Sequence, residues 1–174
     1  MRCHYQESNF EFYLMEYLKL FKIFNQYKVK YLICGGLAVN IYGIPRMTAD
    51  IDILLDFEEE NLTNFETAIK LLLYQNSIPI SIKTFINKEE RQKIIKEKNL
   101  IAYSFYNSNS GFVTLDVLLD TPIIFSELWK NKSERKNNDV SLNLVSVEDL
   151  ISLKKYSNRL QDQNDVLLLS RLLK

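Results

Sequence analysis

The sequence predicts an α+β domain in which helices flank a small mixed β-sheet. Two observations favour this class. Segments whose apolar residues recur at helical spacing are interspersed with short segments typical of strands, and two alternating segments flank a short polar turn, as in a β-hairpin. The chain has 174 residues, 47% hydrophobic and 25% charged, as expected for one globular domain. We therefore predict one domain over residues 1–174, with an N-terminal helix at 8–27, a core at about 29–145 and a pair of C-terminal helices at 146–174.

The first half of the chain begins with an amphipathic helix, because apolar residues recur at helical spacing from Phe10 to Phe24. The apolar segment VKYLIC is typical of a buried strand and stops at Gly35-Gly36. Gly43 ends the short helical segment that follows, since helices commonly end at glycine. These patterns predict a helix at 8–27, a strand at 29–34, a short helix at 37–42, a strand at 50–56 and a helix at 58–75.

The second half contains the hairpin and the terminal helices. LIAYSFY and FVTLDVLL alternate apolar and polar residues on either side of the turn NSNSG. Ser146, followed by Asp149 three residues later, is typical of a helix N-cap. The patterns predict an extended segment at 78–83, a polar helix at 88–98, strands at 100–106 and 112–119, a helix at 123–131, a strand at 139–145 and helices at 147–157 and 161–173.

The charge balance argues against a general nucleic-acid-binding surface. Lys and Arg number 22, and so do Asp and Glu, so no overall positive field attracts phosphate. The two local basic segments, KEERQKIIKEK at 88–98 and KNKSERK at 130–136, contain interleaved acids and are typical of solvated helix faces. The longest apolar runs span only a few residues, against about 20 for a membrane-spanning helix. We therefore expect a cytoplasmic protein with no membrane partner.

The scarce residue types exclude several kinds of active site. His4 is the sole histidine, so a Ser-His-Asp triad, a Cys-His pair and a histidine-bound zinc site are not expected. The two cysteines, Cys3 and Cys34, cannot build a disulfide framework. Any metal ion would have to be held by oxygen ligands.

Three aspartates stand where strands are predicted. Asp50 and Asp52 flank Ile51, and because side chains alternate along a strand, both point to one face within about 7 Å of each other. Carboxylates so close repel one another and disfavour the doubly ionised state, which a divalent cation would relieve. Mg²⁺ prefers such oxygen ligands, and Asp116, in the middle of the later strand, is a candidate third ligand.

Gly35 and Gly36 stand at a predicted strand-to-helix turn. Backbone N–H groups at such a turn can receive phosphate, and the lack of side chains allows close approach. Each feature also has a purely structural explanation: paired glycines commonly serve turn geometry, Asp-x-Asp is frequent at strand ends, and Asp116 could cap a segment or pair with a lysine. Their joint occurrence, in order and on the expected elements, favours a site for a nucleotide polyphosphate and its metal ions.

The order Gly-Gly, a spacer of thirteen residues and Asp-Ile-Asp, with a further aspartate on a later strand, resembles the polymerase-beta-like nucleotidyltransferase superfamily. The resemblance implies a nucleotidyltransferase-like fold in which Gly35 and Gly36 form the phosphate-binding turn. It also implies two bound Mg²⁺ ions, with Mn²⁺ as an alternative. The catalytic, metal-binding acids would be Asp50, Asp52 and Asp116.

The tail EDLISLKKYSNRLQDQNDVLLL is similar to the C-terminal segment of the AbiEii-like branch, which is associated with toxin–antitoxin and abortive-infection systems. That branch carries a lysine on one helix and Arg-x-x-Asp-x-x-Asp leading into the next, and PRMTADID is similar to its approach to the acids. Many of its members have Gly-Ser where this chain has Gly-Gly. The nucleotide contacts implied are Arg46, Thr48, Lys154, Arg159, Asp162 and Asp165. The tail residues could instead form ion pairs on helix surfaces.

The resemblance implies a Mg²⁺-dependent enzyme that transfers an NMP from an NTP to a hydroxyl and releases pyrophosphate. Three kinds of acceptor stay open: the 3′ end of a tRNA, a side chain of a partner protein, and a small molecule such as an antibiotic. The expected setting is a bacterial toxin–antitoxin or abortive-infection system, with a cognate toxin or antitoxin as protein partner. The rival is a catalytically silent protein of the same fold that acts by binding its partner.

Overall fold

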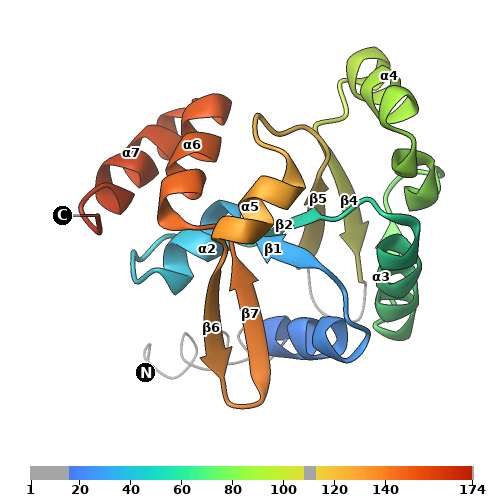
Figure 1. The fold of residues 1–174 in the computed structure, drawn as a ribbon, viewed down its shortest axis with the longest axis horizontal. Helices are drawn as coiled ribbons and strands as arrows, with labels where there is room; N and C mark the ends of the chain where they lie inside the picture. Colours follow the sequence, from blue (N-terminus) through green and yellow to red (C-terminus); the bar gives the residue numbers. More distant parts are fainter. Residues whose placement is uncertain (1–15, 108–112, 174) are drawn as a thin grey trace, which may run out of the picture.

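A seven-stranded mixed sheet forms the centre of the computed structural model, which describes residues 16–107 and 113–173 (Figure 1). The strand order is β3-β4-β5-β2-β1-β7-β6. β2 is parallel to β5 and β1 is parallel to β7, whereas the other neighbours are antiparallel. The predicted α+β class, a mixed sheet flanked by helices, is thus confirmed.

The described chain begins with a helix at residues 16–26. The elements that follow are β1 (Tyr31–Ile33), α2 (Gly35–Ile41), β2 (Ile51–Leu55), α3 (Glu59–Leu71), β3 (Gln75–Asn76), the 3₁₀ helix η1 (Ile82–Ile86), α4 (Lys88–Lys98), β4 (Ala102–Tyr106), β5 (Thr114–Leu118), α5 (Phe125–Asn131), β6 (Ser133–Asn137), β7 (Val140–Leu144), α6 (Val147–Ser157) and α7 (Leu160–Leu169). The last two helices pack side by side (Figure 1).

The two central strands are buried on both faces. Every residue of β1 is buried, and so is every residue of β2 except Asp52. Strands buried on both sides need no alternation, which is why VKYLIC is uniformly apolar. Phe21 and Phe24 of the N-terminal helix pack on Tyr31, with ring centroids 5.2 and 5.3 Å apart, and Phe24 also contacts Phe65 of α3. The partly exposed aspartate is therefore the exception in an otherwise apolar strand.

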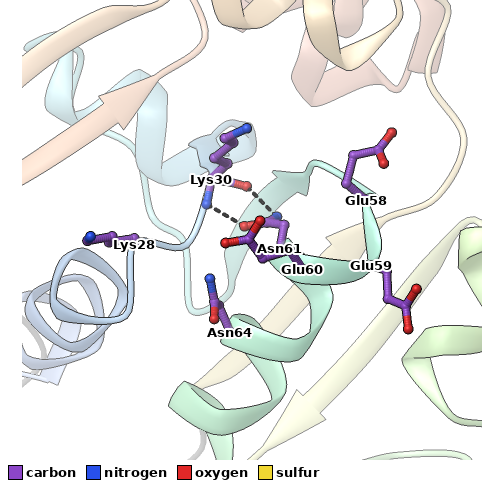
Figure 2. Close-up of a pocket in the computed structure, with 7 residues that line it drawn as sticks. All are labelled: Lys28, Lys30, Glu58, Glu59, Glu60, Asn61 and Asn64. Carbon is purple, nitrogen blue, oxygen red and sulfur yellow. Dashed lines mark hydrogen bonds between the residues drawn. The ribbon is translucent and has the colours of Figure 1, made fainter.

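A buried asparagine joins the ends of these two strands. Asn61, in the first turn of α3, accepts a hydrogen bond from the Lys30 N–H (2.7 Å) and donates to the carbonyls of Lys30 (3.0 Å) and Asp56 (2.8 Å). Lys30 precedes β1 and Asp56 follows β2, so one side chain satisfies three backbone groups where the strands meet the loops. Figure 2 shows the two bonds to Lys30 in a surface hollow of about 720 Å³ whose lining side chains are all charged or polar.

Most predicted elements are confirmed, with small shifts at their ends. α4 has the predicted bounds, and β4 and β5 form the predicted antiparallel hairpin. Ser146 caps α6 by accepting a hydrogen bond from the Asp149 N–H. The first part of the helix predicted at 8–27, most of the NSNSG turn, and Cys3 and His4 lie outside the described residues.

One charged segment was predicted wrongly. KNKSERK at 130–136 was expected to be a solvated helix face, but only its first two residues end α5, and strand β6 begins at Ser133. β6 is the edge of the sheet, and its three central residues are exposed. Charged side chains are common on such edges because they hinder pairing with another chain, so a charged segment alone does not distinguish a helix face from an edge strand.

Four further boundaries differ from the predictions. The helix predicted at 58–75 ends at Leu71, and Gln75 belongs to β3. The short helix begins at Gly35 rather than at residue 37, so the two glycines belong to its first turn. The segment 78–83 contains no strand, since β3 lies before it and η1 begins at Ile82. α7 ends at Leu169 rather than at 173. Across residues 16–107 and 113–173, none of the helices combines the length and apolar character needed to cross a membrane.

Asn61→Ala should destabilise the fold by about 3 kcal/mol, because it leaves buried backbone groups at both central strands without partners. Urea denaturation measures the change in unfolding free energy. Glu60→Ala, at the exposed neighbouring position, is the control and should change it by less than about 0.5 kcal/mol. Equal effects of the two substitutions would contradict the role given to the asparagine.

Candidate active site

Asp52 and Asp116 lie side by side on neighbouring parallel strands. Asp52 of β2 is the register partner of Asp116 of β5, which places their Cα atoms about 5 Å apart. In each strand the residues on either side are buried while the aspartate is only partly so, so both side chains emerge on the same face. Asp50 immediately precedes β2 and is exposed. The predicted alternation is therefore present at Asp52 and Asp116, whereas Asp50, predicted as the first residue of the strand, lies just outside it.

The glycine turn packs directly against the acids. Gly35 has a φ of +60°, and a Cβ atom there would lie only 1.8 Å from Asp52 Oδ2. The Gly36 N–H donates a hydrogen bond to Asp52. A Cβ atom at Gly36 would lie 2.8 Å from both Arg46 Nη1 and Thr48 Oγ1. The two glycines thus let the backbone approach the carboxylate on one side and Arg46 and Thr48 on the other.

Burial and mutual repulsion raise the pKa of both paired aspartates. Burial is the main cause that raises the pKa of Asp52, to about 6, and the charges of Asp116 and Asp50 add to it. Lys154 acts in the opposite direction. Burial also raises the pKa of Asp116, and Asp50 contributes, while a hydrogen bond from Ser104 opposes the rise. The three carboxylates therefore form one electrostatically linked group.

This acidic group has the chemistry of a divalent-cation site. Asp116 Oδ1 is buried and has no hydrogen-bond partner in the described chain. A hard cation would stabilise such an oxygen beside a second carboxylate. Over the described ranges, no three Asp, Glu, His or Cys side chains are already gathered as metal ligands. The backbone brings Asp52 and Asp116 together, and their carboxylates and that of Asp50 would have to turn toward a shared ion.

One cavity of about 870 Å³ connects the predicted site residues. Those that line it are Gly35, Gly36, Arg46, Thr48, Asp50, Asp52, Asp116, Lys154, Arg159 and Asp162. Asp165 is the predicted residue that does not line it, and Arg159 is exposed. Segments from both halves of the sequence therefore converge on one hollow.

A buried ion network joins the loop before β2 to the C-terminal helices. Lys154 Nζ lies 2.7 Å from Asp162 Oδ1 and 2.8 Å from Asp165 Oδ2, and Arg46 Nη1 lies 3.0 Å from the same Asp165 oxygen. Ser157 Oγ donates to the other oxygen of Asp162. The lysine and both aspartates are only 6–7% exposed. The network fixes α6 and α7 against the segment that leads to the acids. Lys154, Asp162 and Asp165 are therefore not the exposed ion pairs on helix surfaces that the sequence left as an alternative.

The charges in this network are nearly balanced. Burial alone would raise the pKa of Asp162, but hydrogen bonds from Lys154 and Ser157 outweigh it and hold that pKa below its ordinary value. Arg46 is different, because its Nε and Nη1 have no well-aligned hydrogen-bond acceptor in the described chain, although Nη1 forms the ion pair with Asp165. Arg46 therefore retains N–H groups that could donate hydrogen bonds to a phosphate oxygen. Contact between Lys154 and a nucleotide stays a prediction.

Sequence reasoning missed several residues of the cavity and its surroundings. Ser104 pairs in register with Asp116 across the β4–β5 hairpin, a neighbour that aligning the two strands could have revealed. Asp120 and Tyr156 line the cavity and share a hydrogen bond of 3.1 Å. Asp120 continues the alternation that starts at Asp116, and this was its signal in the sequence. Tyr156 had no such signal, because one exposed tyrosine on a helix is unremarkable.

The fold and this arrangement define a protein with the nucleotidyltransferase fold. Among solved structures, the chain is similar to the lincosamide antibiotic adenylyltransferase LnuA in its lincomycin-bound form, with a TM-score of 0.58 and 16% identity over 90% of this chain and 95% of that chain. It is also similar to ANT(2″)-Ia in complex with adenylyl-2″-tobramycin (TM-score 0.59, 14% identity, 94% and 90% covered). A third similar structure is an antigenic nucleotidyltransferase-like protein from Paracoccidioides brasiliensis (0.58, 17%, 92% and 75%).

These likenesses concern the fold. No family model matches the chain, and no curated protein matches its sequence. The similar structures support the predicted nucleotidyltransferase-like fold. Membership of the superfamily and of the AbiEii-like branch stays a prediction.

Asp52→Asn should stabilise the metal-free protein at neutral pH. The pKa of Asp52 is raised from 3.8 to about 6 in the folded state. The Asp52 carboxyl therefore makes its full contribution to the unfolding free energy below about pH 4, and this contribution is lost as the pH rises through about 6. The variant avoids that loss, so its gain in unfolding free energy should be small at pH 4 and grow to at most about 3 kcal/mol at pH 8. Urea denaturation in EDTA at each pH measures this difference. Glu127→Gln is an exposed control, and parallel pH curves for wild type and Asp52→Asn would contradict the prediction.

Lys154→Met should lower the unfolding free energy by about 3–5 kcal/mol, because it leaves the buried Asp162 carboxylate without a cation and Asp165 with Arg46 alone. Lys155→Met provides a matched control, since Lys155 is the next residue of the same helix but is exposed. Its effect should stay within about 0.5 kcal/mol. Chemical denaturation of the two variants measures both changes. If Lys154 formed only a loose surface pair, Lys154→Met and Lys155→Met would have equal effects.

Proposed function

We propose that the protein is a nucleotidyltransferase that transfers an NMP from an NTP to a hydroxyl group and releases pyrophosphate. The observation that carries the proposal is the in-register pair Asp52 and Asp116 at the wall of a cavity of about 870 Å³, beside the Gly35-Gly36 turn. The acids offer oxygen ligands to divalent cations. The turn, with Arg46 next to it, offers donors to phosphate oxygens. The similarity in fold to nucleotidyltransferases supports the same conclusion.

Asp50, Asp52 and Asp116 would hold two Mg²⁺ ions, or Mn²⁺ in their place. Bound there, the ions would stabilise the charge on the attacking and leaving oxygens of the transfer. An all-oxygen ligand set suits these ions. Burial first, and then the charges of neighbouring carboxylates, raise the pKa of Asp52 and of Asp116, and a bound cation would relieve the repulsion between these charges.

Asp116 is the proposed acceptor of the proton from the attacking hydroxyl. The hydroxyl oxygen bonds to the α-phosphorus while the bond from that phosphorus to the oxygen bridging to the β-phosphate breaks, and pyrophosphate leaves. A raised pKa makes this carboxylate a better base than an ordinary aspartate.

The remaining polar residues of the cavity would hold the nucleotide. Arg46 and Thr48 cover Gly36 and are proposed to contact the phosphates. Arg159, exposed at the start of α7, would bind phosphate or base at the edge of the cavity. Lys154, with its partners Asp162 and Asp165, would position Arg46 and the C-terminal helices around the bound nucleotide.

For the acceptor, the resemblance of the tail supports a toxin-like enzyme of a toxin–antitoxin or abortive-infection system. Its acceptor would be a tRNA 3′ end or a protein side chain, and its cellular partner a cognate toxin or antitoxin. A second candidate is transfer to a small-molecule hydroxyl. One similar structure is an antibiotic adenylyltransferase with lincomycin and another holds adenylyl-2″-tobramycin, and part of the cavity wall in this chain is apolar.

Asp52→Asn and Asp116→Asn should each reduce transfer at least a hundredfold, because each removes a proposed metal ligand and the second also removes the proposed base. The assay incubates the protein with each radiolabelled NTP, Mg²⁺ and either total tRNA, cell lysate or a set of small hydroxyl compounds. Asp56→Asn is the matched control, because Asp56 follows the other end of β2 and does not line the cavity. Transfer by Asp52→Asn at the wild-type rate would remove the mechanism, and no labelling of any acceptor by the wild type would favour the catalytically silent protein.

A further inference from the structure

Part of the cavity is not used by the proposed nucleotide machinery. Its wall there comes from the segment before β4, from the end of β5 with the loop that follows, and from α6. The residues that characterise it are Ile101, Leu118, Asp120, Pro122, Leu153 and Tyr156. Of these six, four are aliphatic or proline, and Asp120 carries the one charge. This part of the cavity therefore has an apolar wall with a single acidic group.

β5 connects this region to the proposed catalytic acid. Residues 115, 117 and 119 are buried in the core, whereas Asp116, Leu118 and Asp120 line the cavity. At about 3.3 Å per residue, the Cα atoms of Asp116 and Asp120 are at most about 13 Å apart. A small molecule can span that distance with a hydroxyl at Asp116 and a second polar group at Asp120.

Asp120 is held in place but its charge is not balanced. The Tyr156 hydroxyl donates to Asp120 Oδ2 at 3.1 Å, which uses one of the two carboxylate oxygens. Within residues 16–107 and 113–173, no lysine or arginine forms an ion pair with Asp120. Of the three cations that line the cavity, Arg46 and Lys154 pair with Asp165, and Arg159, assigned above to the nucleotide, forms no ion pair with Asp120. A positioned carboxylate beside an apolar wall is suited to bind a cation.

We propose that this region is the acceptor subsite and that it takes a small hydroxyl compound bearing a protonated amine. The ammonium pairs with Asp120, the apolar part of the molecule lies against Leu118 and Leu153, and the hydroxyl reaches Asp116. The proposal rests on the nucleotidyltransferase activity proposed above. It makes Asp120 and Tyr156 specificity residues, with Tyr156 acting through the orientation of the carboxylate.

The same charge disfavours a polynucleotide acceptor. An RNA end brings phosphates close to its terminal hydroxyl, and Asp120 would add to the repulsion already exerted by the acids around Asp116. A protonated amine reverses the sign of that interaction. Of the acceptors that stay open for this fold, an amine-bearing small molecule matches the charge of this subsite.

The test compares acceptors that share their hydroxyl groups but differ in charge. The probes are neamine against tetra-N-acetylneamine, and glucosamine against N-acetylglucosamine. Transfer from labelled NTP with Mg²⁺ is measured for wild type, Asp120→Asn, Tyr156→Phe and the exposed control Glu127→Gln, together with KM for the NTP and the melting temperature of each variant. Binding of a non-hydrolysable NTP analogue to the wild type is measured separately by calorimetry.

We expect the wild type to modify an amine probe with a kcat/KM at least about tenfold above that of its acetylated counterpart, since a hydrogen bond to a charged group contributes that much or more. Asp120→Asn should abolish this preference by raising KM for the amine, and Tyr156→Phe should weaken it by a smaller factor. Glu127→Gln should retain it.

Two outcomes overturn the subsite while leaving the proposed function standing. In the first, both members of each pair are modified equally. In the second, tRNA or protein is labelled and neither amine is. If the analogue does not bind and nothing is labelled, the proposed function fails, and the acceptor subsite fails with it.

Discussion

The juxtaposition of two like charges, Asp52 and Asp116, is the constraint on which the rest of the structure depends. Carboxylates directly opposite each other in a sheet are unfavourable, and burial adds to the repulsion because it removes the water that would screen it. Here they occur between strands whose neighbouring residues are fully buried. The ladder of β2 with β5 and its buried apolar residues hold the two aspartates in register, and the Asn61 hydrogen bonds join β2 to β1 at the strand ends. A structure that needed only stability would have no use for this pair, which is the physical reason to regard it as functional.

The C-terminal helices also bury charged side chains, but these have opposite signs and form ion pairs. Lys154 and Arg46 share Asp165 Oδ2, and Asp162 completes the network. One end of this network belongs to the segment that leads into β2, and the other belongs to α6 and α7. The position of the helices is therefore coupled to the glycine turn over which Arg46 lies. A ligand that draws Arg46 away would have to compete with Asp165, so binding of the proposed nucleotide would be physically linked to the position of the helices.

The sequence predicted local features well and long-range pairing only in part. Strand alternation correctly predicted that Asp52 lies within a strand, because that geometry depends only on the backbone period, whereas Asp50, predicted to be the first residue of this strand, precedes it. The register partner of Asp52 lies 64 residues away in Asp116, and no local pattern specifies which residue of a distant strand stands opposite. The same limit explains why surface ion pairs remained an alternative for Lys154 and its acids, since their burial comes from packing between α6, α7 and the loop of Arg46. β6 was missed because a charged edge strand and a charged helix face have the same composition.

The Gly36 position bears on whether the site is functional. In the AbiEii-like branch, which the tail resembles, many members have serine there, and its absence could be taken as the loss of a phosphate contact. In this chain a Cβ atom at residue 36 would meet Arg46 Nη1 and Thr48 Oγ1, each at 2.8 Å. A serine would therefore displace the Arg46–Asp165 ion pair and the Thr48 hydroxyl, which donates to the Asp50 carbonyl at 3.3 Å. The Thr48 hydroxyl already occupies the space where a serine side chain would begin, so a hydroxyl donor is retained next to the acids although it comes from a different residue. Gly36 is thus explained by its close packing against Arg46 and Thr48, so the absence of a serine at this position is not evidence that the site has lost its chemistry.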